Sequence, residues 1–473
     1  MQRMLKGLFA GALVLVLAGQ GCGSVTKGLS PEAQRASQPV ALNVWGVADD
    51  FDVYEDAFNQ YRLEHPNVSF QYRRLRLEEY ETDLVDALAE DRGPDIFLVH
   101  NTWTDKYLTK TVPMPTATNV AYSTITGTIK KERTWEVRRE PTITLRAYKD
   151  AFADVAVKDT VRTVNVSTQA DKSDFQERLM GVPVTVDTLA LYYNKDLLNA
   201  AGIPNPPEQW GPFVEQVKKL TKLNATGDLQ QAAAGIGTAL NVDRAVDLVS
   251  VLMLQNGAEM ADENGYPRFQ AIPAELSNLR TEPPAWQALA FYTDFANPGK
   301  DTYTWNENQP NSLDAFIQGR TAFFFGYAYH LPIVKSRAPK LNLGITALPQ
   351  IEGNPIKNYA NYWYLTVSRK SKNQDVAWNF LNSLTKPELA VKVLDKAKRP
   401  AARKSLLASQ LEDEAVGVFA SQVLTATSWY RGKNPQAMEE AFLTMIGDVV
   451  AGRAEVGRAV RVAADKVGQT VGR

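Results

Sequence analysis

Residues 181–202 read GVPVTVDTLALYYNKDLLNAAG, and the periodicity of this stretch changes halfway along it. The first half, Val182–Tyr193, is rich in β-branched and aromatic residues and is apolar enough to be buried on both faces, which predicts a strand inside a sheet. From Asn194 onward leucines and alanines recur at helical spacing, with Asn194 as a candidate N-cap and Gly202 as the stop. Because similar α/β patterns lie on both sides of it, the stretch predicts a point where the chain passes from one lobe to another.

Length and composition favour a soluble protein of two lobes. The chain has 473 residues, whereas a single hydrophobic core usually stops growing at about 250–300 residues. Hydrophobic residues make up 44% and charged residues 22%, and the formal net charge is -1. Such a charge gives no bulk field that would attract nucleic acid or an anionic membrane, so composition favours a small-molecule partner.

The N-terminus resembles a bacterial lipoprotein signal. Arg3 and Lys6 precede an apolar run over 8–18, which is too short to span a bilayer and ends just before Cys22, the only cysteine. Gly19 stands where such signals carry a leucine. We expect residues 1–22 to be the signal, Cys22 to take the lipid and residues 23–39 to form a flexible tether. The alternatives are a plain cleaved signal and an incidental cysteine.

Polar and aromatic residues follow the expected strands of the N-terminal half. Strands are expected over 41–45, 67–73 and 95–99, and amphipathic helices over 53–64 and 78–91. Ligands of open α/β sheets bind outside the carboxyl ends of the strands. The residues expected to converge on that rim are Trp45, Asp49, Asp50, His100, Asn101 and Trp103.

The C-terminal half adds further aromatic residues at expected strand ends. TAFFF at 321–325 is apolar enough for a central strand and is followed by Tyr327 and Tyr329. Residues 358–368 contain Tyr362 and Trp363, and the helical pattern from 411 to the end is interrupted at 429–435. Weak alternation over 116–139 indicates a surface hairpin with no functional interpretation.

Several motifs, in order along the chain, resemble those of the extracellular solute-binding proteins of ABC importers, in particular the sugar-binding, maltodextrin-binding-like class. The motifs are GPDIF at 93–97, GVPVTVDTLALYYNKDLL at 181–198 with PEQW at 207–210, AFIQGRTAFFFG at 315–326, and AWNFLNSLTKPE at 377–388 with RPAARKS at 399–405. Each motif alone is weak, but their order and spacing together are specific. The region 116–139 is longer than the family needs.

The resemblance implies an α/β fold of two lobes, like that of periplasmic binding proteins, with three hinge crossings. These crossings would lie near 184–188, 322–325 and 362–363. The N-lobe would hold residues 40–183 and 325–361, and the C-lobe residues 184–324 and 362–473. Closure of the lobes would enclose a ligand and present it to a membrane permease.

The resemblance also implies a function. The protein would be a monomeric, non-enzymatic receptor without a cofactor that captures a sugar or oligosaccharide for an ABC permease. It would work outside the cytoplasm, anchored to the outer face of the bacterial membrane or in the periplasm.

Sugar rings expose C–H faces that pack on aromatic rings, and their hydroxyls bind planar polar groups. The predicted ligand-binding residues are Trp45, Asp49, Asp50, Asn101, Trp103, Tyr327, Tyr329, Tyr362, Trp363, Trp429 and Arg431. The alternative is that the aromatic residues only pack the lobes, and that Trp429 and Arg431 form a capped surface turn. We expect Tyr192, Tyr193 and Lys195 to serve lobe packing and the helix start.

The sequence leaves two alternatives to this function. The same fold could bind another solute, such as a peptide or a polyol phosphate, and a secreted glycoside-acting enzyme is a more distant alternative. Asp49 and Asp50 are adjacent and so face opposite ways, whereas glycoside hydrolysis needs two carboxyls facing one bond. Without an HExxH motif or a cysteine pair, His100 and His330 are expected to have ordinary hydrogen-bonding roles rather than to bind a metal.

Overall fold

The computed structural model describes residues 31, 34, 37–47, 49–126, 132–167 and 171–472. The predicted signal segment and Cys22 lie outside this part of the chain, as does most of the predicted tether. Within these residues no helix combines the length and apolar character needed to cross a membrane.

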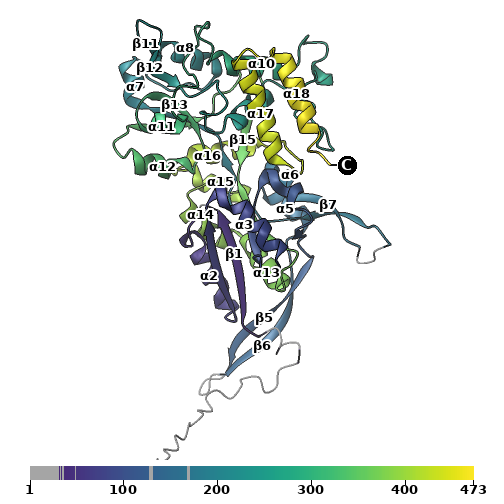
Figure 1. Ribbon diagram of the computed structural model, residues 1–473. Helices are drawn as coiled ribbons and strands as arrows, with labels where there is room; N and C mark the ends of the chain where they lie inside the picture. The colour runs from purple at the N-terminus through teal and green to yellow at the C-terminus, as the bar shows by residue number, and fades with distance from the viewer. Residues whose placement is uncertain are drawn as a thin grey trace, which may run out of the picture.

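The molecule has two lobes, each built on a five-stranded sheet with helices packed around it (Figure 1). The order of the first sheet is β2 (Val68–Leu75), β1 (Val40–Val47), β3 (Ile96–His100), β16 (Trp363–Ser368) and β4 (Thr111–Val112). The order of the second sheet is β11 (Lys222–Leu223), β12 (Leu229–Ala234), β13 (Thr321–Gly326), β10 (Ala190–Asn194) and β14 (Leu343–Ala347). The predicted two-lobed α/β fold is confirmed.

Amphipathic helices supply the other half of each core. Around the first sheet lie α2 (Asp52–Glu64), α3 (Leu77–Ala89), α4 (Thr104–Tyr107), α5 (Leu145–Ala151), α6 (Asp154–Thr160), α13 (Gln374–Leu384), α14 (Pro387–Ala397) and α15 (Lys404–Gln410). Around the second lie α7 (Lys195–Ala200), α8 (Trp210–Leu220), α9 (Ala245–Gln255), α10 (Pro284–Asp294), α11 (Ser312–Ile317), α12 (His330–Arg337), α17 (Pro435–Val450) and α18 (Val456–Gly468). The helix α16 (Gly417–Gln422) contributes Phe419 to one core and Ala420 to another, so it packs where the lobes meet. Short 3-10 turns occur at Asn101–Trp103, Ala274–Leu276 and Val423–Thr425.

A small third sheet joins the lobes. Its strands are β17 (Ala426–Thr427), β15 (Asn358–Asn361) and β9 (Asp187–Thr188), in that order. Val186 belongs to the first core and Leu189 to the second, and the same change of core occurs between Tyr359 and Ala360. After β17 the chain leaves the first core for the last time and enters the second at Trp429. The three strands of this sheet are therefore the three crossings between the lobes.

Two of the predicted crossings agree with this sheet and one is wrong. The crossing near 184–188 contains β9, and the one near 362–363 directly follows β15. The crossing predicted at 322–325 lies instead in the middle of the second sheet, because β13 pairs with β10 and β12. The missing crossing is β17. An apolar strand buried on both faces has the same pattern whether it crosses between lobes or lies inside one, so the sequence did not separate these cases.

The predicted lobe boundaries are wrong for the same reason. Residues 325–358 belong with the second sheet, since β14 pairs with β10. Residues 363–410 belong with the first lobe, because β16 pairs with β3 and the core of that lobe includes α13 and α14. Only the C-terminal helices α17 and α18 return to the second lobe, where Figure 1 shows them in yellow beside α10.

The stretch 181–202 is a strand and helix as predicted, but the strand is interrupted. Val182 and Thr185 form only isolated bridges to Leu365 and Ala401, and β9 and β10 follow as separate strands. Asn194 caps α7, since its side chain accepts from the backbone N–H groups of Asp196 and Leu197 at 3.0 and 3.3 Å. Gly202 ends the turn with a φ of 67°.

Two hairpins extend from the first lobe. The longer joins β5 (Ala117–Thr126) to β6 (Glu132–Pro141) and confirms the predicted surface hairpin. The shorter joins β7 (Val161–Asn165) to β8 (Phe175–Leu179). In Figure 1 the β5–β6 hairpin projects away from the second lobe.

Candidate functional site

An aromatic group lies at the edge of the first sheet, next to the crossing β15. Trp363, the first residue of β16, pairs with His100 at the end of β3, and their ring centroids are 5.1 Å apart. Trp103 contacts Trp363 edge to face with centroids 5.2 Å apart. The rings of Trp103 and Trp363 are only partly buried. Two of the predicted ligand residues therefore form one partly exposed aromatic surface.

Two tyrosines of the second lobe lie at the end of β13. Tyr327 and Tyr329 stack with ring centroids 5.6 Å apart and an interplanar angle of 12°. Tyr327 is fully buried and donates its hydroxyl hydrogen to Asp247 at 2.7 Å, while Tyr329 is partly buried. Tyr329 therefore presents the more accessible ring of the pair.

Asp247 links the aromatic groups of the two lobes. It accepts hydrogen bonds from Tyr327, from Arg244 at 2.9 Å and from the Asn361 amide at 3.1 Å. Asn361 belongs to β15, and its Oδ1 lies 3.1 Å from Nε2 of His100. A continuous polar path thus runs from His100 through one crossing strand to Arg244. Burial and, to a smaller extent, the positive charge of Arg244 lower the pKa of His100 to about 4.

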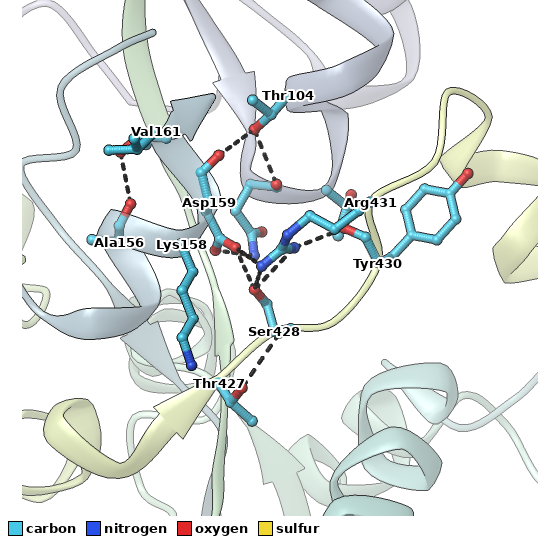
Figure 2. Close-up of polar contacts among 12 residues, drawn as sticks. Thr104, Ala156, Lys158, Asp159, Val161, Thr427, Ser428, Tyr430 and Arg431 are labelled. Atoms are coloured by element: carbon cyan, nitrogen blue, oxygen red, sulfur yellow. Dashed lines mark hydrogen bonds and ion pairs between the residues drawn. The ribbon is translucent and has the colours of Figure 1, made fainter. Parts of the chain in front are cut away.

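A second polar cluster surrounds Asp159 at the end of α6 (Figure 2). This carboxylate is fully buried and accepts from four side chains. The donors and distances are Asn101 Nδ2 at 3.1 Å, Tyr362 OH at 2.8 Å, Ser428 Oγ at 2.6 Å and an Arg431 guanidinium nitrogen at 2.6 Å. Ser428 and Arg431 follow β17, and Tyr362 follows β15. Asp159 therefore holds two crossings against the first lobe.

The remaining crossing, β9, carries its own buried carboxylate. Asp187 accepts from the backbone N–H groups of Thr188, Ala328 and Tyr329 at 2.9, 2.9 and 3.2 Å, which fixes the turn after β13. Burial raises the pKa of Asp187 to about 6, against the lowering effect of the backbone donors and of Arg399. Each crossing strand is thus held by at least one buried aspartate.

The other predicted site residues lie in different surroundings. Asp49 forms a bidentate ion pair with Arg399, and both line a cavity of about 20 Å³ together with Trp363. Asp50 pairs instead with Arg74 at 2.5 Å in an exposed position. The two adjacent carboxylates therefore point to different partners, as expected from the alternation of a strand-like segment.

Two predicted tryptophans are buried away from the aromatic group. Trp45 lies in the core of the first lobe, with the Arg73 guanidinium 4.6 Å from its ring centroid. Trp429 lies in the core of the second lobe and donates to Ser250 at 3.1 Å. Tyr192 is also buried, as predicted for a packing residue.

Sequence reasoning missed the residues that connect the predicted ones. They are Asp159, Asp187, Arg244, Asp247, Asn361, Arg399 and Ser428. One signal could have found Asp247, because it is a charge inside the apolar helix AVDLVSVLMLQ and buried charges need partners. His330, expected to have an ordinary hydrogen-bonding role, accepts from the Tyr327 backbone N–H and contacts Asp243.

The described residues contain no group of three or more His, Cys, Asp or Glu side chains that could hold a metal ion. A larger cavity, of about 460 Å³, lies at the base of the β5–β6 hairpin rather than at the lobe junction. Its lining includes Val40, His65, Asn119 and Asp375. The contacts concentrated at the junction are aromatic contacts, hydrogen bonds and ion pairs.

Comparison with known proteins agrees with this architecture. The chain is 25% identical over 224 residues to a putative binding protein of Brucella abortus and 26% identical over 241 residues to the multiple sugar-binding protein of Streptococcus mutans. These matches cover 46% and 50% of this chain and 49% and 54% of the relatives, so the chain matches about half the length of these curated proteins.

Among solved structures, the fold is similar to that of the GacH receptor of Streptomyces glaucescens, determined unliganded and with acarbose. The TM-score is 0.65 at 17% identity, and the match covers 92% of this chain and 98% of the receptor. Residues 47–391, well over half of the chain, match the profile of the bacterial extracellular solute-binding proteins. Given that match and a fold of two sheets joined by three crossing strands, the chain belongs to the family of bacterial extracellular solute-binding proteins.

Proposed function

We propose that this protein is the receptor of an ABC importer and that it captures a sugar or oligosaccharide between its lobes. The observation that carries the proposal is the partly exposed pair Trp103 and Trp363, next to the crossing β15. Aromatic rings of this kind pack against the C–H faces of sugars. The relatives named for sugar binding and the neighbour solved with acarbose support the same ligand class.

Capture would proceed by closure about the three crossings, which would bring Tyr329 of the second lobe toward the Trp103 and Trp363 rings. The polar residues around Asp159 and Asp247 are already hydrogen-bonded to these two aspartates. They would thus keep the crossings in register, while the partly exposed rings contact the ligand. This role is that of a binding protein rather than an enzyme.

The proposal includes a location. Cys22 would carry a lipid, residues 23–39 would tether the lobes to the outer face of the cell membrane, and a permease in that membrane would receive the ligand. Mass spectrometry of the chain purified from bacterial membranes tests the anchor, because lipidation adds a defined mass to a mature chain that begins at Cys22. An N-terminus at another residue would contradict the anchor and leave the ligand proposal standing.

A thermal-shift screen against sugars, oligosaccharides, polyols and peptides tests the ligand class, since a ligand that binds the native state raises its melting temperature. We expect sugars to raise it. Trp363→Ala should weaken binding about tenfold, on the order of 1–2 kcal/mol, because one stacking surface is lost. Trp135→Ala is the matched control, since Trp135 is a partly exposed tryptophan of the β5–β6 hairpin. A shift produced only by peptides or polyol phosphates would replace the sugar by that solute.

A further inference from the structure

The β5–β6 hairpin separates its charges by face. The register pairs Ile125 with Arg133, Ser123 with Trp135, Ala121 with Val137 and Asn119 with Arg139, so these side chains share one face, which we call the basic–apolar face. The opposite face carries Glu136, Arg138 and Glu140. The basic–apolar face therefore holds two arginines and no acidic residue among its described side chains.

Toward the base of this face, Asn119 donates to Asp375 at 3.3 Å and Ala121 is buried, but its other large side chains lack ionic or aromatic partners within the described part of the chain. Arg133 and Arg139 are exposed and form no ion pair there, whereas Arg138 on the other face pairs with Glu136 at 3.2 Å. Ile125 is 58% exposed, and Trp135 is partly exposed without a ring contact to any described aromatic residue. Basic side chains beside an exposed tryptophan and an exposed aliphatic residue are the composition of surfaces that lie at the membrane interface.

The hairpin also starts where the chain emerges from the lobe. Val40, the first residue of β1, lines one cavity together with Asn119–Ala121 at the base of β5. The tether of the proposed function, residues 23–39, would have 17 residues, and a flexible coil of that length would span about 20–25 Å on average. Pro31 and Gln34 within it are helical, which shortens that span. The strands of the hairpin have ten residues each and so reach about 33 Å.

The lengths of the tether and of the hairpin limit how far from the bilayer the hairpin can lie. A hairpin longer than the mean span of the tether, starting beside the point of attachment, reaches the bilayer surface unless it points away from it. We propose that the basic–apolar face of the β5–β6 hairpin binds the surface of an anionic bilayer and orients the first lobe on it. Where it uses the length of the tether, this proposal rests on the lipid anchor of the proposed function. The charges and apolar side chains of the face support it independently of that anchor.

Vesicle flotation tests the proposal with the chain from residue 23 onward, which keeps both lobes because their sheets and helices start at Val40. We expect the protein to float with vesicles of equal parts phosphatidylglycerol and phosphatidylcholine, far less with phosphatidylcholine alone, and less at high salt. Arg133→Gln with Arg139→Gln should weaken partitioning about fivefold for each arginine. Ile125→Ser and Trp135→Ser should each weaken it as well.

The controls lie on the second lobe. Lys219→Gln with Lys340→Gln changes the net charge by the same amount at exposed residues, and Leu279→Ser removes a leucine that is 78% exposed. Both controls should float like the original chain. The two arginines have no ion pair with any described residue to lose, so their variant remains informative even if Trp135→Ser loosens the hairpin.

Three results would overturn the proposal: no flotation with anionic vesicles, equal loss in the hairpin and control variants, or self-association that only the hairpin variants abolish, which would make a second copy the partner. Sugar binding is tested separately, because the thermal shift that reports it is measured in the absence of lipid. A hairpin variant that still shows the sugar shift but no longer floats supports the membrane role alone.

Discussion

Asp159 and Asp187 are the same residue type, at nearly the same burial, in the same hinge, yet their surroundings differ. Asp159 is 0% exposed and accepts from the Arg431 guanidinium and from three neutral side chains. Asp187 is 2% exposed and, among the residues that the structure describes, accepts only from backbone N–H groups. Burial raises the pKa of Asp187 to about 6. The two carboxylates therefore differ in whether they have a direct cationic partner, and not in how deeply they are buried.

Breaking the Asp159 cluster should have the largest effect on stability. Arg431→Ala leaves a buried carboxylate without its cation and should lower the free energy of unfolding by about 3–5 kcal/mol. Urea unfolding at pH 7 measures this loss. The matched control is Arg74→Ala, which breaks the exposed pair with Asp50 and should change stability by less than about 1 kcal/mol. Equal losses in the two variants would contradict a special role for the Asp159 cluster.

His100 is a buried residue that is positively charged when protonated, in contrast to the two carboxylates. Its pKa falls from 6.5 to about 4 on folding, so between these pH values the unfolded chain binds more protons than the folded one, and stability rises with pH. The difference corresponds to about 3 kcal/mol, lost as the pH falls from 6.5 toward 4. His100→Gln should remove this contribution from the pH profile of stability, measured by urea unfolding from pH 4 to 7. A variant whose profile matches that of the original chain would contradict it.

Asp187 should act in the opposite direction over nearly the same range. Its pKa rises from 3.8 to about 6, so the folded chain binds more protons between these values and stability falls as the pH rises, by about 3 kcal/mol or somewhat less. Asp187→Asn should remove that fall while its amide oxygen keeps an acceptor for the Thr188 and Ala328 N–H groups. The exposed Asp50→Asn is the control and should keep the original profile.

The two titrations partly cancel in the unmodified chain. Urea unfolding of His100→Gln should therefore show stability falling from pH 4 to 6, and that of Asp187→Asn should show it rising. The double variant should lack both contributions and keep only those of other groups, such as His65, whose pKa burial also lowers. Parallel profiles in the two single variants would mean that other groups set the pH dependence of the hinge.

Much of the site was predictable from sequence, but its connections were not. Trp103 and Trp363 were predicted at strand ends and do come together, because both flank a junction of β3 with β16. Asn101, Tyr362 and Arg431 were predicted as ligand contacts, and the structure shows all three bound to Asp159. The sequence did not indicate the role of Asp159, because a single acidic residue near the end of a helix has the pattern of a solvent-exposed residue. The partners of Asp159 come from distant segments of the chain, which only the fold brings together.

The sequence by itself determined the elements and the family pattern. The caps, such as Asn194 at α7, and the buried strands follow from local residue order, because propensity and periodicity act over neighbouring residues. Only the tertiary structure decided which central strand joins which sheet. TAFFF lies inside the second sheet and the two residues of β17 form the third crossing, because strand pairing is chosen by long-range packing that apolar strands of equal pattern do not encode.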